Sequence, residues 1–367
     1  MICAYTGAHL AQSQPPTTAD ILGNLPDALE CTVTRDTDGL FELSLTYPAQ
    51  GANAGALKVN NWVYSPVGGT MGMQYFRIDQ TTEDIGGTVT VHASHVTYNS
   101  LAILAAPFSV HNPNDYSNVN FFNWYSELTT AINVIDSTQM GSFSVVGYTD
   151  EMLLRPAAYT EPVTLKQAIL DAISDRPEIY LNYIDFGYRL WQLPSATGGS
   201  SFRIRYGRDM LSFSSSVDAT DFYTHVMPYY VADNKMISHN RDVYPLEGLP
   251  SEYASLRRIK AINLADYYDD LNASYDLSIV QSIINKWLAA NPWNPLPEEI
   301  SVENIPQEGN TFELGAVGKI YYTPTGAIYT ANVVSLTYDV LAERVTSIGI
   351  NKRQKDVTDT IAGLVQR

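Results

Sequence analysis

Two histidines, His92 and His95, have the spacing that comes nearest to a metal-ligand pair in this sequence. They lie in the alternating segment Thr88 to Val96, which predicts a β-strand. Side chains three positions apart on a strand point to opposite faces, so one ion could contact both only where the backbone is irregular. We therefore predict no metal site at this pair.

A second group that could do chemistry is a cluster of carboxylates beside Tyr267 and Tyr268, formed by Asp266, Asp269, Asp270 and Asp276. Such a cluster could bind a cation or supply a general acid and base. A solvated acidic surface explains the same residues, and we adopt that interpretation. The GxSxG, HExxH, CxxC, Walker A and complete EF-hand motifs are absent from the sequence. We therefore predict no catalytic residue, no cofactor and no metal.

Aromatic residues are abundant, with 25 Tyr and 5 Trp in the chain. Trp293 lies in the proline-rich segment Asn291 to Pro297, which follows an expected helix. This segment could be a contact loop, with Trp293 and nearby Tyr stacking on sugars, or it could turn the chain back toward a sheet. Glycan-array binding would distinguish a carbohydrate-binding module from the other functions considered below.

The charge of the chain argues against a grip on nucleic acid. The chain has 367 residues, of which 39 are acidic and 22 basic, so its formal charge is −17. The excess of acidic residues is spread over three quarters of the chain. Lys/Arg clusters are no larger than Arg257, Arg258 and Lys260, or Lys352, Arg353 and Lys355, whereas phosphate binding requires a cationic face. A hydrophobic share of 45% excludes disorder, and the length predicts two to four domains.

Compartment signals are few. The longest apolar run, Leu101 to Ala106, stops at Pro107 and is too short for a membrane-spanning segment, which needs about 20 residues. The N-terminus has no signal peptide pattern. Cys3 and Cys31 are the only cysteines, and we interpret them as two buried thiols.

The elements that must position these residues are mostly strands in the first 100 residues. An Asp38-Gly39 turn lies in the hairpin from Cys31 to Pro48, and its second strand alternates apolar and polar residues. Further strands are expected at 62–65, 75–80 and 88–96. This pattern predicts a small antiparallel β domain.

Helices enter in the next segment, 101–205. Phe121, Trp124, Leu128 and Ile132 recur at helical spacing, and a capping box at Thr164 to Gln167 begins a second helix that stops before Pro177. Strands are expected at 142–146, 179–184, 188–193 and 201–206. This segment therefore predicts an α+β domain.

Two later features are helical. The start signal of Ser278 with Gln281 predicts a third helix that runs to Leu288. Near the C-terminus Val357, Ile361 and Leu364 have the spacing of a coiled-coil seam, although one heptad is too short to be stable alone, and a frayed helix is the alternative.

An internal echo links the two ends of the chain. WVYSP, Trp62 to Pro66, and IYYTP, Ile320 to Pro324, each begin a run of three expected strands at similar spacing. Chance similarity between two meanders is one explanation. The other is that a β module occurs twice, with other segments between the copies.

Four segments in order resemble the N-terminal region of phage tail-tip hub proteins, the family that includes tail-associated lysins and prophage tail endopeptidases. They are DGLFELSLTYP (38–48), QYFRIDQ with TVTVHASH (74–95), LSFSSSVDATDFYTHVMPYY (211–230) and SLTYDVLAERVTSIGINKRQKDVTDTI (335–361). Many members of the family continue into a hydrolase, a coiled coil or a receptor-binding module, whereas this chain stops at Arg367. The 231–250 stretch fits the family poorly.

The resemblance implies a β-rich α+β, multidomain hub fold with two similar β-barrel domains. The expected parts are a first β-barrel domain at 1–100, an α+β domain at 101–205, a second β-barrel domain at 206–245 and 308–350, a helical insertion domain at 246–307 and a C-terminal segment at 351–367. Candidate interface residues are Trp62, Tyr64, Trp293, Tyr321, Tyr322, Val357, Ile361 and Leu364.

The function that the resemblance implies is structural. A homotrimer at the distal end of a phage tail would close the tail tube and form the channel for DNA exit. Expected partners are a hexameric distal tail protein or tail tube ring, a tape-measure protein, tail fibre or receptor-binding proteins, and phage DNA that passes without specific binding. Its location would be the virion, after assembly in the host cytoplasm. The enzymatic alternative is a cell-wall (peptidoglycan) hydrolase or peptidase that uses carboxylates or His225, which a zymogram would detect.

Overall fold

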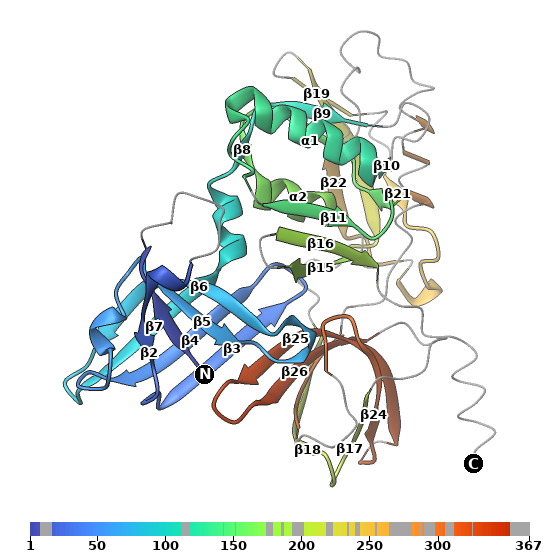
Figure 1. Cartoon of the computed structure of the whole chain (residues 1–367). Coiled ribbons are helices and arrows are strands. Elements are labelled where there is room, and N and C mark those ends of the chain that lie inside the picture. The colour runs from blue at the N-terminus through green and yellow to red at the C-terminus, as the bar shows by residue number, and fades with distance from the viewer. Residues whose placement is uncertain are drawn as a thin grey trace.

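The protein is described by a computed structural model that covers residues 1–7, 17–111, 118–141, 143–150, 152–173, 179–184, 187–192, 202–217, 223–232, 235–238, 243–253, 255–263, 281–282, 284–285, 288–289, 298–304, 312–324 and 326–352. Most of its regular elements are strands (Figure 1). A 13-stranded sheet dominates the fold. The β-rich α+β class expected from the sequence is therefore confirmed.

Seven strands at the N-terminus form what we call the first module. They are β1 (Cys3–Tyr5), β2 (Ile21–Asn24), β3 (Glu30–Asp36), β4 (Phe41–Pro48), β5 (Trp62–Pro66), β6 (Met73–Glu83) and β7 (Thr88–His95). Their order in the sheet is β3-β4-β7-β6-β5-β1-β2. Phe41, Leu43 and Leu45 of β4 are buried and alternate with exposed or half-buried neighbours, as the sequence predicts. The turn at Asp38-Gly39 is also confirmed, since Gly39 adopts a φ of 101° and the Asp36 carboxylate accepts from the N–H groups of Asp38 and Leu40.

Six strands form what we call the second module. They are β17 (Phe202–Arg205), β18 (Met210–Val217), β23 (Glu298–Asn304), β24 (Val317–Tyr322), β25 (Ala327–Asp339) and β26 (Arg344–Lys352). The ladder runs β18-β23-β26-β25-β24-β17, and β25 also pairs with β3 of the first module. The two modules are therefore joined in one hydrogen-bonded sheet, which the sequence did not predict.

The chain between the two modules in the sequence forms a layer of helices and short strands. It contains β8 (Leu104–Ala105), β9 (Phe108–Val110), β10 (Val119–Asn120), α1 (Phe121–Asp136), β11 (Ser144–Gly147), β12 (Leu153–Leu154), β13 (Ala157–Tyr159), β14 (Val163–Thr164), α2 (Leu165–Ile173), β15 (Ile179–Ile184) and β16 (Gly187–Gln192). Figure 1 shows α1 and α2 beside the three-stranded sheet β11-β16-β15. Both helices bury the stripes expected from their spacing, and Thr164 Oγ1 accepts from the N–H of Gln167 at 3.2 Å as a cap.

A separate four-stranded sheet contains β19 (His225–Ala232), β20 (Lys235–Ser238), β21 (Tyr244–Pro245) and β22 (Ile259–Asn263). Short 3-10 helices occur at Thr18–Asp20, Ala54–Ala56, Gly69–Met71, Val96–Leu101 and Ser251–Tyr253. Of the third expected helix, residues 281–282, 284–285 and 288–289 are helical, and the rest lie outside the described residues. No helix in the described part of the chain has the length and apolar character needed to cross a membrane.

Three sets of strand pairs join segments that the sequence assigns to different domains. β17 was expected with the α+β segment but pairs with β24, and β23 was expected in the helical insertion but pairs with β18 and β26. β19, in the segment expected for the second barrel, pairs with β20 and β21 and also with β22 of the expected helical insertion. The reason in each case is a partner strand distant in sequence, so local patterns do not reveal it. The boundaries themselves stay a prediction.

The internal echo corresponds to two antiparallel meanders, β5-β6-β7 and β24-β25-β26. The middle strand of each contains a register irregularity, between Ile78 and Gln80 in β6 and between Val333 and Ser335 in β25. The WVYSP and IYYTP segments do not correspond residue by residue, however. Val63 and Ile320 face the main core, whereas alignment of the prolines would pair Ile320 with Trp62, which packs in a separate cluster.

Candidate functional site: a buried polar junction

The first and second modules meet where β3 pairs with β25, over Asp36↔Ser335 to Thr32↔Asp339. The Thr37 N–H donates to the Val334 carbonyl at 2.9 Å, and the Val340 N–H donates to the Cys31 carbonyl at 2.9 Å. Continuous backbone pairing is stiff, because any relative rotation of the modules breaks ladder hydrogen bonds that water cannot readily replace. The junction therefore fixes how the modules are oriented.

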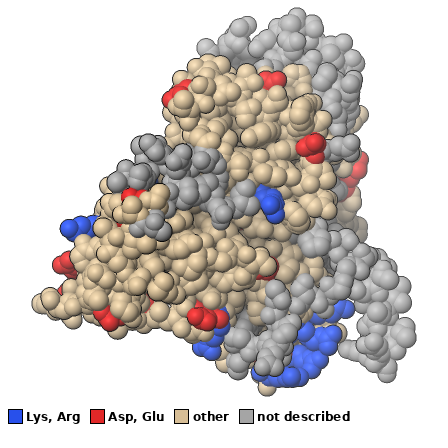
Figure 2. Space-filling view, viewed as in Figure 1, with Lys and Arg blue, Asp and Glu red and all other residues tan. Residues whose placement is uncertain are grey.

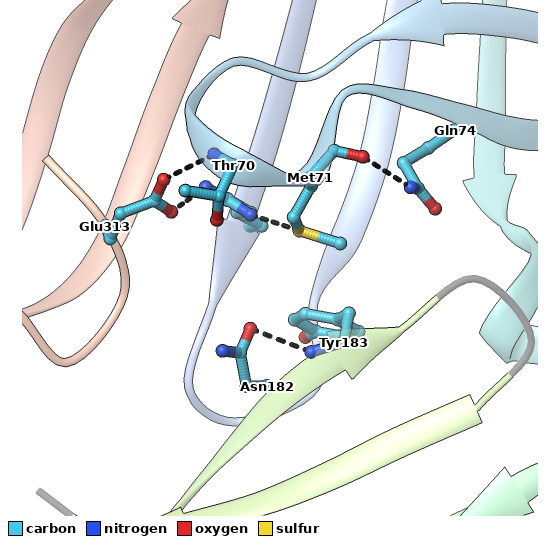
Figure 3. Close-up of polar contacts among 7 residues, drawn as sticks. Thr70, Met71, Gln74, Asn182, Tyr183 and Glu313 are labelled. Carbon is cyan, nitrogen blue, oxygen red and sulfur yellow. Dashed lines mark hydrogen bonds and ion pairs between the residues drawn. The ribbon is translucent and has the colours of Figure 1, made fainter.

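An ion pair crosses this junction. The Arg35 Nη2 of β3 lies 2.9 Å from the Glu313 Oε2, just before β24, and Arg35 is only 1% exposed. Figure 3 shows that the other carboxylate oxygen of Glu313 accepts from the Thr70 N–H, at 2.7 Å. Arg35 Nη1 also donates to the Met71 sulfur. One carboxylate from the second module thus holds a cation and a backbone donor of the first.

The loop between β5 and β6 is shaped to receive Glu313. Gly68 and Gly69 have φ values of 73° and 61°, in the left-handed region that residues other than glycine rarely adopt. A Cβ atom on Gly69 would overlap the Glu313 carboxylate, and one on Gly68 would overlap the Tyr338 ring of β25. Both glycines are therefore required for the close approach of this loop to the second module.

Burial sets the electrostatics of the Arg35 environment. Removal from water lowers the pKa of Arg35, and Glu313 opposes that shift both by its charge and by its hydrogen bond. An arginine starts so far above neutrality that the guanidinium stays charged. Burial without Glu313 would leave that charge uncompensated, which costs several kcal/mol.

His95 belongs to the same buried network. Its Nε2 lies 3.0 Å from the Gln74 Oε1 and its Nδ1 lies 3.0 Å from the Thr97 Oγ1, while its ring stacks on Phe41 at 4.0 Å. Burial, with a smaller contribution from Arg35, lowers the pKa of His95 well below its usual value, so the imidazole is neutral. Both ring nitrogens are engaged, which suits a core histidine rather than a base or ligand.

The α+β layer contacts this junction through the β3-β4 hairpin. The Tyr183 hydroxyl of β15 donates to the Asp36 and Leu40 carbonyls at 3.1 and 2.9 Å, and the Leu181 N–H donates to the Thr37 carbonyl at 3.2 Å. Burial raises the pKa of Tyr183 well above its usual value, so the hydroxyl remains a donor. Three parts of the chain therefore converge on one hairpin.

Metal binding finds no support at the residues that could do chemistry. His92 is exposed and His95 buried, on opposite faces of β7, as their spacing predicts. Within the residues that the structure describes, no group of three or more His, Cys, Asp or Glu side chains could hold a metal ion.

Cys3 and Cys31 are free, buried thiols, as expected, and burial raises the pKa of Cys31 to about 12. His225 lies in β19, with its Nδ1 2.8 Å from the Thr224 Oγ1. The cluster from Asp266 to Asp276 lies outside the described residues.

The expected interface residues fall into two places. Trp62 is 3% exposed and packs with Cys3, Tyr5 and Val96, so it could support an interface only from beneath. The half-buried Tyr64 stacks on Tyr75 with ring centroids 4.3 Å apart.

In the second module Tyr322 stacks on Phe213, also at 4.3 Å, and Tyr321 lies within 5.9 Å of the Arg203 guanidinium. The two tyrosine sites lie on different modules and are not brought together in one chain. Trp293, Val357, Ile361 and Leu364 lie outside the described residues, so their role stays a prediction.

Sequence reasoning missed Arg35 and Glu313. One signal was present, since Arg35 follows Cys31 and Val33 at alternating positions and so faces the core. A charge on that face requires a partner. Nothing in the sequence indicates that the partner lies at position 313.

Three solved structures resemble the whole chain. A tail protein from Neisseria meningitidis matches with a TM-score of 0.59 and 9% identity, over 98% of each chain. A prophage tail protein from Listeria monocytogenes matches at 0.56 and 13%, over 100% of this chain and 98% of that chain. A prophage 43 kDa tail protein from Shewanella oneidensis matches at 0.54 and 12%, over 95% of this chain and 97% of that chain.

No protein-family model and no curated sequence matches this chain. At identities this low the structural similarity shows the fold alone. The fold is that of phage tail proteins, in agreement with the broad resemblance of the sequence.

Proposed function

We propose that this protein is a structural, non-enzymatic component of a phage tail, a homotrimeric hub at the distal end that closes the tail tube and forms the channel for DNA exit. The observation that carries this proposal is the match of the full chain, end to end, to phage tail proteins. We do not propose the lysin or endopeptidase activity after which the family is named.

The repeat within the chain supports a hub role. Two β meanders joined in one sheet give each subunit two related units, so three subunits present six. We propose that each module closes as a barrel and that the six barrels form a ring. Such a ring could sit on a hexameric distal tail protein or tail tube ring and so resolve a mismatch between three-fold and six-fold symmetry. The stiff junction at Arg35 and Glu313 would keep the six units at the same level along the axis of the ring.

The other proposed partners follow from that location. They are a tape-measure protein above the ring and tail fibre or receptor-binding proteins around it, in a virion assembled in the host cytoplasm. The formal charge of −17 suits a channel wall that DNA passes without binding, because like charges repel. An acidic wall also has no cations to displace the counterions condensed on the DNA, which is the step that drives binding.

The mass of the native particle tests the proposal. A trimer predicts a species near three times 40.6 kDa, about 122 kDa, by light scattering after size exclusion. A clean 40.6 kDa monomer at high concentration would contradict it.

A further inference from the structure

The outer face of β17 and β24 carries Arg203, Arg205 and Lys319, and together with Arg208, in the turn after β17, these cations form what we call the basic face. Phe202 and Ile204 of β17 are buried, so Arg203 and Arg205 face outward. The parallel register places Arg203 beside Lys319, and neighbouring strands lie about 4.8 Å apart. Like charges therefore lie side by side on one sheet face, which makes this face a candidate for contact with an acidic partner.

Aromatic and apolar groups adjoin these cations. Arg205 lies beside the half-buried Tyr321, which is opposite Ile328 of β25, 49% exposed. The Arg208 side chain is 62% exposed and lies 3.6 Å from the Asp209 carboxylate, which is buried. Figure 2 shows Lys and Arg gathered at the lower end of the second module, where β17, β18 and β24 lie.

A surface of opposite character lies at the tip of the β6-β7 hairpin, which we call the acidic tip, formed by Glu83, Asp84 and Ile85. Both carboxylates are exposed and Ile85 is fully exposed. The Thr88 hydroxyl and N–H donate to the Asp84 carboxylate at 2.8 and 3.2 Å, and these bonds lower its pKa. The tip is therefore charged and held in one conformation, which reduces the entropy lost on docking.

We propose that the acidic tip of one subunit docks on the basic face of the next subunit. This inference rests on the proposed homotrimer. The two surfaces lie on different modules and have opposite charge, so a second copy can bring them together. A contact between unlike surfaces is heterologous, and three such contacts close a ring. Glu83 and Asp84 would meet the cations, and Ile85 would meet Tyr321 and Ile328.

The observations favour a second copy over DNA as the occupant. Residues 1–100 carry 9 acidic and 3 basic side chains, and Arg35, one of the three, is buried. The first module therefore presents an acidic surface to a neighbour. Four cations on a chain of charge −17 would neutralise few phosphates, and Arg with Tyr is the composition of a protein interface. Burial of the basic face between subunits would also leave the channel acidic.

Charge reversal tests the contact. Arg205→Glu with Lys319→Glu should weaken trimer formation at least about tenfold in sedimentation equilibrium, as should Ile85→Ser. Adding Glu83→Lys to the reversed pair should restore part of the affinity. Arg344→Glu makes the same kind of charge change at an exposed cation of β26, outside the basic face, and should leave the trimer unchanged.

The opposite results are distinct. A wild-type monomer contradicts the proposed trimer and this contact together. A stable trimer that the reversed pair does not weaken, or that Arg344→Glu weakens equally, overturns the contact alone. Mobility shift of a 20-base-pair duplex by the wild-type protein, lost in the reversed pair while the trimer persists, would assign the basic face to DNA and overturn it as well.

Discussion

At the scale of single residues, Arg35 and Glu313 connect positions 278 apart in the chain. A buried ion pair is weak evidence for stability, because desolvation offsets its attraction, but it is specific about geometry. Arg35 reaches Glu313 only when β3 and β25 are paired in the observed register. The pair therefore favours one arrangement of the two modules over others.

Glu313→Leu should lower the free energy of unfolding by about 3 kcal/mol, because it leaves the Arg35 charge buried without a partner. Urea unfolding followed by tryptophan fluorescence measures this. The double variant Arg35→Met with Glu313→Leu removes both charges and should recover most of the loss. A single variant as stable as the wild type would show that water already solvates Arg35.

His95 predicts an acid sensitivity with a definite sign. The folded state holds His95 neutral, whereas the unfolded chain protonates it below its ordinary pKa of about 6.5. Below that pH the unfolded state binds more protons than the folded state. The contribution of neutral His95 to the free energy of unfolding is therefore fully present above about pH 7, and it falls as the pH drops, by up to about 1.4 kcal/mol per pH unit.

The variant His95→Gln should flatten the dependence of unfolding free energy on pH between about 6.5 and 5. His92→Gln, on the exposed face of the same strand, should leave the wild-type slope unchanged. Equal slopes in wild type and His95→Gln would show that His95 is protonated in the fold.

At the scale of elements, local signals predicted local structure. The Thr164 cap, the stripes of α1 and α2 and the alternation of β4 and β7 were all readable, because each depends on residues close in sequence. The pairing of β17 with β24 and of β3 with β25 was not readable. These strands are more than 100 residues apart, and alternation shows which face is buried without showing which strand lies alongside.

The candidate site followed the same rule. The sequence placed Tyr64 and Tyr321 on related strands, and the alternation of Cys31, Val33 and Arg35 contained a signal, which we missed, that Arg35 faces inward. It could not bring Glu313 to Arg35, nor gather Lys319 with Arg203, since those neighbours exist only after the sheet forms.

The loop at Gly69–Met71 gives a test of how tightly the modules dock. Gly69→Ala should destabilise the fold beyond the 1 to 2 kcal/mol, roughly, that a left-handed alanine costs, because its Cβ displaces Glu313 from Arg35. Gly326→Ala has a similar φ of 68° with open space around it, and it should show the backbone cost alone. Thermal unfolding compares the two, and equal losses would mean that the loop yields without disturbing Glu313.

At the scale of the whole molecule, one stiff ladder between β3 and β25 joins the first module to the second, and an α+β layer contacts the β3-β4 hairpin (Figure 1). This arrangement resembles a fixed spacer, because its buried polar groups serve to orient modules. A ring of six related units is the assembly that such a subunit suits.

Electron cryo-microscopy of the assembled protein tests that central claim most directly. Viewed along its axis, the particle should have three-fold symmetry with six similar lobes around a channel, each subunit contributing both its first and its second module. Particles that contain one chain, or rings in which the second module lies away from the channel and only three lobes surround it, would contradict the account.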